Sequence, residues 1–181
     1  MNIDKLTPGD IPDKVNVFIE ISDGSSVKYE IDKESGVLFA DRFVHGALFY
    51  PVNYGFIPGT HAEDGDCVDV LVLASYALHP GTVVKCRILG LLEMEDEEGI
   101  DTKIIAVPTA KIDPFMAEVT CIEDIPAMKK AQIKNFFDRY KRPRGREMGQ
   151  NQRIPRKGRG YQGNRTIIIT LLWMILEKIH Q

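Results

Sequence analysis

Short apolar stretches separated by turns dominate the first 140 positions of this chain. Residues 15–21 alternate between apolar and polar side chains, and residues 27–31 follow after the turn at 22–26, which indicates two half-buried β-strands. The same criteria predict further strands over residues 37–40, 52–57, 68–74, 82–92 and 104–107. Many short strands with few helices are typical of a small closed or partly closed β-barrel.

One segment before residue 142 predicts a helix. It starts near Glu123 and Asp124, has Pro126 in its first turn, and continues through Tyr140 with apolar residues at helical spacing. A chain of 181 residues is long enough to bury a substantial core. We therefore expect a mainly β (α+β) fold with one or two helices, in a single domain over residues 1–141.

The net charge of −3 is divided unevenly along the chain. Residues 1–141 hold 14 Lys and Arg against 24 Asp and Glu, whereas residues 142–181 hold 9 against 2. Residues 142–165 are rich in Gly and Arg and are expected to be disordered, and an apolar run of ten at 167–176 is too short to span a bilayer. That run could cap the barrel or promote aggregation. The basic stretch leaves nucleic-acid binding open as a second function.

The cysteines and the N-terminus indicate a cytoplasmic protein. Cys67, Cys86 and Cys121 are odd in number and form no Cys-x-x-Cys pair, which argues against a disulfide framework and a zinc site. Residues 1–12 carry charges and no apolar run, so no secretory segment is expected at this end.

The segment Asp64-Gly65-Asp66-Cys67-Val68-Asp69 places three carboxylates within six positions, directly before a buried apolar run. Hard divalent cations bind several oxygen ligands, and an acidic turn at the mouth of a strand supplies them. The spacing differs from that of an EF-hand loop. Taken alone, the segment is equally compatible with a solvated acidic turn.

Further charged and phenolic side chains follow the expected strands and the helix. They are Lys28, Glu30, Arg42, Asp96, Asp101, Lys103, Tyr140 and Lys141. Lys28 and Glu30 lie on one face of a strand, as do Asp101 and Lys103. Carboxylates that hold Mg²⁺ beside cations that neutralise phosphate suit phosphoryl transfer to water. The alternative is a set of unrelated surface salt bridges.

The order and spacing of these motifs decide between the two interpretations. They are Lys28-Tyr29-Glu30-Ile31-Asp32-Lys33, Asp41-Arg42-Phe43, Tyr50-Pro51-Val52-Asn53-Tyr54-Gly55, the Asp64–Asp69 loop, Asp96 with Asp101-x-Lys103, and Phe136-Phe137-x-x-Tyr140-Lys141. Over residues 1 to about 141 the chain resembles the soluble family I inorganic pyrophosphatases of bacterial type. The resemblance implies hydrolysis of pyrophosphate to two orthophosphates with several Mg²⁺ ions per site. It also implies an OB-fold-like closed five-stranded barrel with flanking hairpins, in a homohexamer.

The resemblance also implies a role for each site residue. Asp64, Asp69 and Asp101 resemble the ligands of the activating metals, and Asp96 and Glu30 resemble those of the metals that arrive with substrate. Asp66 resembles the base that acts on the water nucleophile. The phosphate-binding positions are matched by Lys28, Arg42, Tyr54, Lys103, Tyr140 and Lys141. An OB-fold module that binds single-stranded nucleic acid through the basic tail is the alternative function.

Two features depart from the family pattern. Cys67 stands where the family usually has proline, which would fix φ and stiffen the ligand loop. After Lys141 the usual continuation of the family is missing. Back-translation from Arg142 with the frame moved by one base permits Ala-Leu-Glu-Gly-Gly-Lys-Trp-Val-Lys-Ile, which resembles that continuation. We therefore interpret residues 142–181 as an out-of-frame tail with no independent domain.

Overall fold

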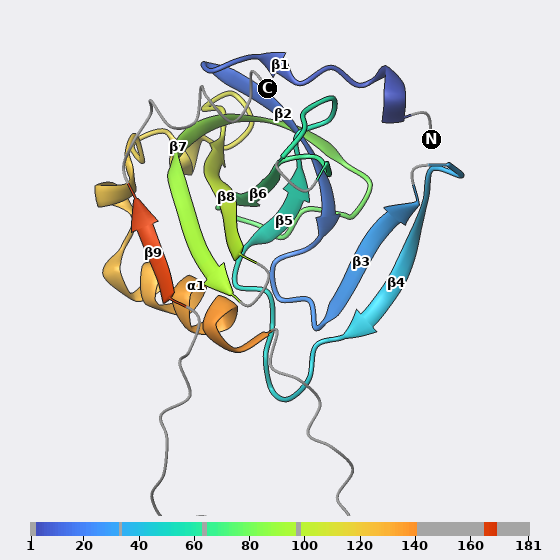
Figure 1. The fold of residues 1–181 in the computed structure, drawn as a ribbon. Coiled ribbons are helices and arrows are strands. Elements are labelled where there is room, and N and C mark those ends of the chain that lie inside the picture. The colour runs from blue at the N-terminus through green and yellow to red at the C-terminus, as the bar shows by residue number, and fades with distance from the viewer. Residues whose placement is uncertain (1–2, 33, 63–64, 97–98, 141–164, 170–181) are drawn as a thin grey trace, which may run out of the picture.

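Five strands form a closed ring in which every strand pairs with two neighbours (Figure 1). In ring order they are β2 (Lys14–Ile21), β5 (Asn53–Phe56), β6 (Asp69–Val72), β8 (Gly99–Pro108) and β7 (Val83–Asp96), which pairs again with β2. All pairings in the ring are antiparallel except β6 with β8. The closed five-stranded, mainly β architecture expected from the sequence is confirmed.

This computed structural model describes residues 3–32, 34–62, 65–96, 99–140 and 165–169. For residues 4, 95, 96, 99, 100 and 165–169 only the backbone is described. Of the expected site residues, Asp64 and Lys141 lie outside the described residues, as does most of the C-terminal tail. Within the described ranges, no helix is long and apolar enough to cross a membrane.

Strand β8 begins earlier than the sequence pattern indicates. The pattern predicts a strand from residue 104 and a turn at residues 97–100, but β7 and β8 continue their pairing until Asp96 lies opposite Gly99. The polar residues Asp101 and Lys103 are therefore part of the ladder, opposite Met94 and Leu92. They alternate with their neighbours as strand residues do.

The helical segment is divided at Pro126. A 3₁₀ turn, η3 (Ile122–Asp124), comes first, and α1 (Ala127–Tyr140) starts after the proline. The predicted start near Glu123 was therefore a few residues too early. Ile125 is extended, with φ −70° and ψ 126°, because proline disfavours the helical region for the residue before it. Two more 3₁₀ turns, η1 and η2, span Ile3–Lys5 and Pro114–Met116.

A separate hairpin stands beside the ring (Figure 1). Its strands, β3 (Val27–Asp32) and β4 (Val37–Phe43), pair only with each other among the described strands. A register shift between Lys28 and Tyr29 marks a bulge, which leaves Asp41 without a partner in the register. The hairpin is held to the ring through β2, and Figure 1 shows it on the opposite side of the ring from α1 and β9.

The apolar core forms two clusters on opposite faces of the same strands. Val70, Val72, Ile104 and Ala106 belong to one cluster. Alternate residues, such as Leu71 and Ile105, belong to the other, which also includes Ile133, Phe136 and Phe137 of α1. Because successive strand residues face opposite sides, Asp69 and Lys103 lie on the face that α1 covers. The polar site thus continues one face of the core.

The remaining strands lie at the edges of the sheet. β1 (Gly9–Asp10) pairs with the start of β2, and β9 (Arg165–Ile169) pairs antiparallel with the end of β7. β9 also contacts α1, and Figure 1 shows it between β7 and that helix. Part of the C-terminal apolar run therefore adds an edge strand to the sheet.

Candidate active site

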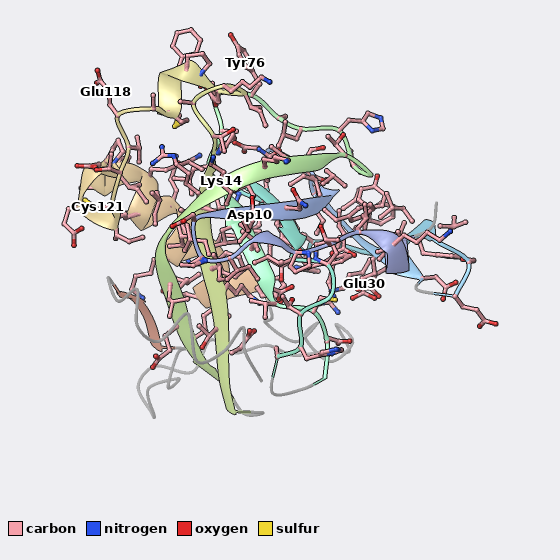
Figure 2. All side chains as sticks on the ribbon, turned by 90° about the horizontal axis from the view of Figure 1, so that it is seen from above. Asp10, Lys14, Glu30, Tyr76, Glu118 and Cys121 are labelled. Atoms are coloured by element: carbon pink, nitrogen blue, oxygen red, sulfur yellow. The ribbon has the colours of Figure 1, made fainter. Side chains whose placement is uncertain are left out.

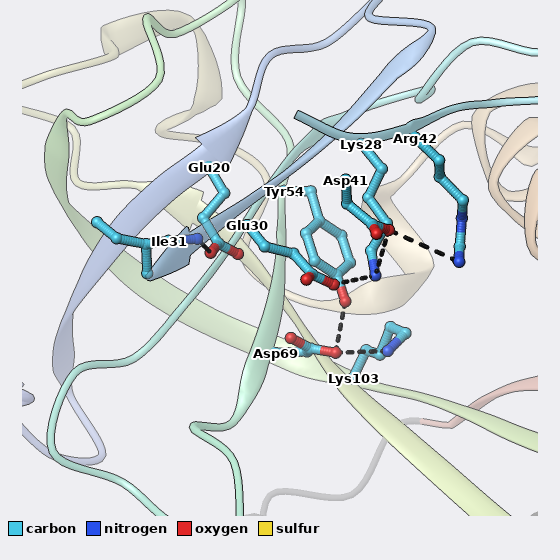
Figure 3. Close-up of polar contacts among 9 residues, drawn as sticks. All are labelled: Glu20, Lys28, Glu30, Ile31, Asp41, Arg42, Tyr54, Asp69 and Lys103. Carbon is cyan, nitrogen blue, oxygen red and sulfur yellow. Dashed lines mark hydrogen bonds and ion pairs between the residues drawn. The ribbon is translucent and has the colours of Figure 1, made fainter. Parts of the chain in front are cut away.

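Two carboxylates converge on one buried ammonium group at the end of the parallel strand pair. Lys103 Nζ lies 2.6 Å from Asp69 Oδ2 and 3.0 Å from Asp101 Oδ1, and its side chain is only 3% exposed. The hydroxyl of Tyr54 donates to the same oxygen of Asp69 (Figure 3). The expectation that Asp101 and Lys103 share one face is thereby confirmed.

The charges of this group stabilise one another. Burial on its own lowers the pKa of Lys103, but the adjacent Asp69 and Asp101 carboxylates outweigh burial and raise that pKa above its ordinary value. Lys103 therefore stays protonated at neutral pH. Burial also raises the pKa of Tyr54, and the negative charge of Asp69 adds to it. Tyr54 consequently remains a hydrogen-bond donor to the carboxylate.

The β3–β4 hairpin supplies a second group of charges (Figure 3). Lys28 forms an ion pair with Glu30, which confirms that both lie on one face of β3. Asp41, at the bulge, lies 3.5 Å from Lys28 Nζ and 3.6 Å from Arg42 Nη1. Arg42 is 45% exposed, so its guanidinium remains accessible to a ligand. Asp41 is thus a contact of both predicted phosphate-binding cations.

Glu20 joins the hairpin to the ring and was not predicted from the sequence. It lies buried on β2, and its Oε1 accepts a hydrogen bond from the backbone N–H of Ile31 at 2.9 Å. Burial raises the pKa of Glu20 to about 7; Asp69 and Glu30 raise it further, and the Ile31 N–H opposes the rise. The sequence carried no signal for this role, because Glu20 occupies a polar position of an alternating strand.

Aromatic rings connect α1 to the carboxylate group. Tyr140 stacks on Phe136 with ring centroids 5.4 Å apart, and Phe136 packs on Tyr50 at 4.6 Å. Tyr50 in turn packs edge-on against Tyr54 at 5.7 Å. These contacts link the last residue of α1 to Tyr54, and the phosphate-binding role of Tyr140 stays a prediction.

The acidic loop is held by a buried hydroxyl. Thr60 donates to Ile57 O at 2.6 Å and accepts from the N–H of Val68 at 3.0 Å, which closes the loop in front of β6. Gly65 has φ +85°, a conformation that favours glycine. Asp66 is exposed, and its carbonyl accepts from Ala62 N–H at 2.7 Å. The exposed carboxylate is accessible to water, as a base requires.

The described carboxylates do not by themselves complete a metal site. Across the described side chains, no three His, Cys, Asp or Glu residues form a group that could hold a metal ion. The side chains of Asp64 and Asp96, which the sequence predicts as further ligands, are not among those described. The structure therefore brings Asp69 and Asp101 together around Lys103 and places Glu30 in the ion pair with Lys28, and it leaves Asp64 and Asp96 untested.

The three cysteines are separate from one another. All three lie among the described residues and form no disulfide, and burial raises the pKa of Cys86 to about 12. Cys121 lies far across the molecule from Glu30 in Figure 2. Only Cys67, half-buried in the acidic loop, is close in sequence to the predicted ligands.

The chain matches known proteins over most of its length. Residues 17–159 match the family model described as inorganic pyrophosphatase. The inorganic pyrophosphatase of Aquifex pyrophilus is 51% identical over 142 residues, which cover 78% of this chain and 80% of that protein. The inorganic pyrophosphatase of Campylobacter jejuni is 51% identical over 141 residues, which cover 78% and 82%.

Solved structures give the same result. The inorganic pyrophosphatase of Thermus thermophilus superposes with a TM-score of 0.74 at 46% identity, covering 78% of this chain and 80% of that one. The Helicobacter pylori inorganic pyrophosphatase superposes with a TM-score of 0.73 at 50% identity, covering 76% and 81%. Both the family model and these relatives span more than two thirds of the chain. The chain therefore belongs to the inorganic pyrophosphatase family.

Proposed function

We propose that this protein hydrolyses inorganic pyrophosphate to two orthophosphates by means of a metal-activated water, with Mg²⁺ as the metal. The observation that carries the proposal is the pair of carboxylates, Asp69 and Asp101, on Lys103. Figure 3 shows Asp69 and Lys103 facing the cations Lys28 and Arg42 of the hairpin. Anionic and cationic groups on facing elements suit a substrate that is itself a metal–anion complex.

The donor set fits Mg²⁺. Asp69 and Asp101 present carboxylate oxygens on either side of Lys103, and hard divalent cations prefer carboxylate oxygens as ligands. We propose that these two residues hold the activating metals together with Asp64. Glu30 and Asp96 would hold the metals that bind with substrate. When bound, the metals lower the pKa of a coordinated water and neutralise phosphate charge.

The remaining residues bind and orient the substrate. Lys28 and Arg42 are donors at the hairpin, and Lys103, Tyr54 and Tyr140 are cationic or phenolic donors on the ring and α1; Lys141 is proposed beside Tyr140. Because Lys103 is buried and stays charged, it stabilises negative charge in a region of low dielectric, where such an interaction is strong.

Asp66 is the proposed base. Its carboxylate would accept the proton of the attacking water, and its place on an exposed loop before β6 leaves it accessible for this. A positioned base contributes roughly 10²–10⁴-fold to a rate. We therefore expect Asp66→Asn to lower kcat by about that factor with the fold unchanged.

The test is release of phosphate from pyrophosphate with Mg²⁺ by the full chain. Asp10→Asn is the matched control, because Asp10 is an exposed aspartate on β1 and takes no part in the proposed site. Hydrolysis by the unsubstituted protein and by Asp10→Asn, with loss in Asp66→Asn, supports the proposal. A folded, full-length protein that releases no phosphate refutes it, and full activity in Asp66→Asn refutes the role of the base.

Cellular context is part of the proposal. The three cysteines form no disulfide, which supports a reducing compartment, so we propose the cytoplasm. Resemblance to the family supports a homo-oligomer, a hexamer in the bacterial type, which sedimentation of the full chain tests directly. Nucleic-acid binding finds no support, because the basic segment lies outside the described residues and the matched relatives are inorganic pyrophosphatases.

A further inference from the structure

Two different strands pair with the same edge of β7. One edge of β7 pairs with β8, from Cys86 to Asp96. On the opposite edge, β2 pairs only with Val83 to Cys86. A bulge between Ile88 and Gly90 separates this part from the remainder of β7. Beyond the bulge, residues 91–95 pair with β9, from Leu91 opposite Ile169 to Glu95 opposite Arg165. In the described structure β9 is the strand that pairs with this part of the β7 edge.

The same part of β7 supports the predicted metal and phosphate residues. Met94 pairs with Asp101 on one side and with Thr166 on the other. Leu92 likewise pairs with Lys103 on one side and with Ile168 on the other. β9 therefore lies directly across one strand from Lys103, which contacts Asp69, and from Asp101, which contacts Lys103. It also contacts α1, which ends at Tyr140.

Residues 165–169 lie beyond the end of the family match at residue 159. The strand is thus a feature of this chain's own C-terminal sequence. Antiparallel β-hairpins of two strands are marginally stable, and a third strand on the free edge makes them markedly more rigid. The end of the β7–β8 hairpin projects past the closed ring and has that free edge.

The direction of the backbone groups follows from one hydrogen bond. Leu73 N–H donates to Ala106 O, so the backbone groups of Ala106 face β6. Because these groups alternate along a strand, those of Lys103 face β7 and those of its partner Leu92 face β8. The N–H of Glu93 must then face β9, where its partner is Ile167. By the same alternation, the N–H of Ile168 faces away from β7.

We propose that β9 is a brace that positions Asp101 and Lys103 for metal and phosphate binding by completing the edge of β7. Its backbone ladder holds the distal half of the hairpin, and its contact with α1 fixes that half relative to the end of the helix. The effect on metal binding rests on the function proposed above, whereas the effect on the hairpin does not.

The test compares two proline variants of the full chain. Ile167→Pro removes an N–H that faces β7, and Ile168→Pro removes one that faces away, as is tolerated in edge strands. We expect Ile167→Pro to raise the Mg²⁺ concentration for half-maximal pyrophosphate hydrolysis by about tenfold, the size of effect that supporting contacts have on metal sites. kcat at saturating Mg²⁺ should change much less, and Ile168→Pro should behave as the unsubstituted protein.

Hydrogen exchange of the metal-free protein provides a second measurement. In the unsubstituted chain the amides of Leu91, Glu93 and Glu95 should be protected, and Ile167→Pro should release them while Leu92 and Met94 stay protected by β8. Fast exchange at Glu93 in the unsubstituted chain overturns the proposal even if Ile167→Pro does not fold. Equal Mg²⁺ requirements in both variants and the unsubstituted protein also overturn it. If no form hydrolyses pyrophosphate, the proposed function fails, and hydrogen exchange still decides whether β9 braces the hairpin.

Discussion

Replacement of Glu20 by glutamine should stabilise the metal-free protein, and the gain should grow with pH. Glutamine keeps an oxygen that accepts the N–H of Ile31, as Glu20 does at 2.9 Å. It cannot ionise, whereas the glutamate is buried beneath the hairpin with Asp69 and Glu30 near it. The substitution therefore removes a buried negative charge and preserves the hydrogen bond.

The magnitude follows from the pKa of the folded state. The pKa of Glu20 is raised from 4.5 to about 7, mainly by burial. Between these values the unfolded chain loses its proton first, so the stability of the native protein falls as pH rises. Since one pKa unit corresponds to about 1.36 kcal/mol, the ionised carboxylate costs the folded state on the order of 3 kcal/mol above pH 7.

Urea denaturation in EDTA at pH 5, 6, 7 and 8 measures this difference. The free energy of unfolding of Glu20→Gln should exceed that of the unsubstituted protein by a margin that widens from about pH 4.5 to pH 7 and is constant above. EDTA keeps divalent cations from changing the charge around the carboxylate. Glu34→Gln, an exposed glutamate in the β3–β4 turn, serves as the control.

Two results would refute the reasoning. A margin that does not change with pH would show that Glu20 has an ordinary pKa in the folded protein. A margin that narrows as pH rises would show that the ionised form is the more stable one, as when Lys28 approaches more closely than the structure indicates.

Four other outcomes are expected. Gly55→Ala should lower the free energy of unfolding by at least about 2 kcal/mol, measured by urea denaturation. The new Cβ would lie 1.8 Å from the carbonyl oxygen of Phe18, and the backbone of Phe18 cannot move away because it is held in the sheet. Asn53→Leu should lower the free energy of unfolding by about 2–4 kcal/mol in the same assay, because the buried amide of Asn53 forms hydrogen bonds with the backbone of two loops. An unchanged denaturation midpoint would contradict this. Cys67→Pro should lower the Mg²⁺ concentration that half-activates the enzyme, because proline restricts the ligand loop; an increase would count against that view. Sequencing both strands of the gene around codon 141 should confirm a one-base shift that the gene itself carries, so that residues 142–181, including β9, are translated out of frame; an unbroken frame would refute the out-of-frame interpretation of the tail.

The strands of the ring were largely predictable, because their apolar residues carry a clear signal. The start of β8 was predictable only in part, because the apolar signal begins at residue 104. Asp101 and Lys103 are polar on the face that joins the core, and only their alternate spacing placed them on the strand. The pairing of β2 with β7 also has no local signal, since it joins segments that are distant in sequence. Closure of the ring was therefore inferred from the number of strands and from resemblance.

The site was predictable where its residues fall in motifs. The Lys28–Glu30 and Asp101–Lys103 contacts follow from the period of a strand, and the structure shows both. Glu20 was missed because a polar residue in an alternating strand normally faces solvent, and only the docked hairpin buries it. Burial by an element from elsewhere in the chain leaves no trace in the local sequence.

The parallel pairing of β6 with β8 has a consequence for folding. Asp69 and Asp101 belong to strands separated by the whole of β7, and the β7–β8 hairpin forms from neighbouring residues. Local pairs form early, whereas long-range parallel pairs must wait for the intervening chain to be ordered. The two carboxylates therefore meet late in folding. After denaturation, activity should therefore return more slowly than β-structure does. The rate at which activity returns should measure the formation of the β6–β8 pairing.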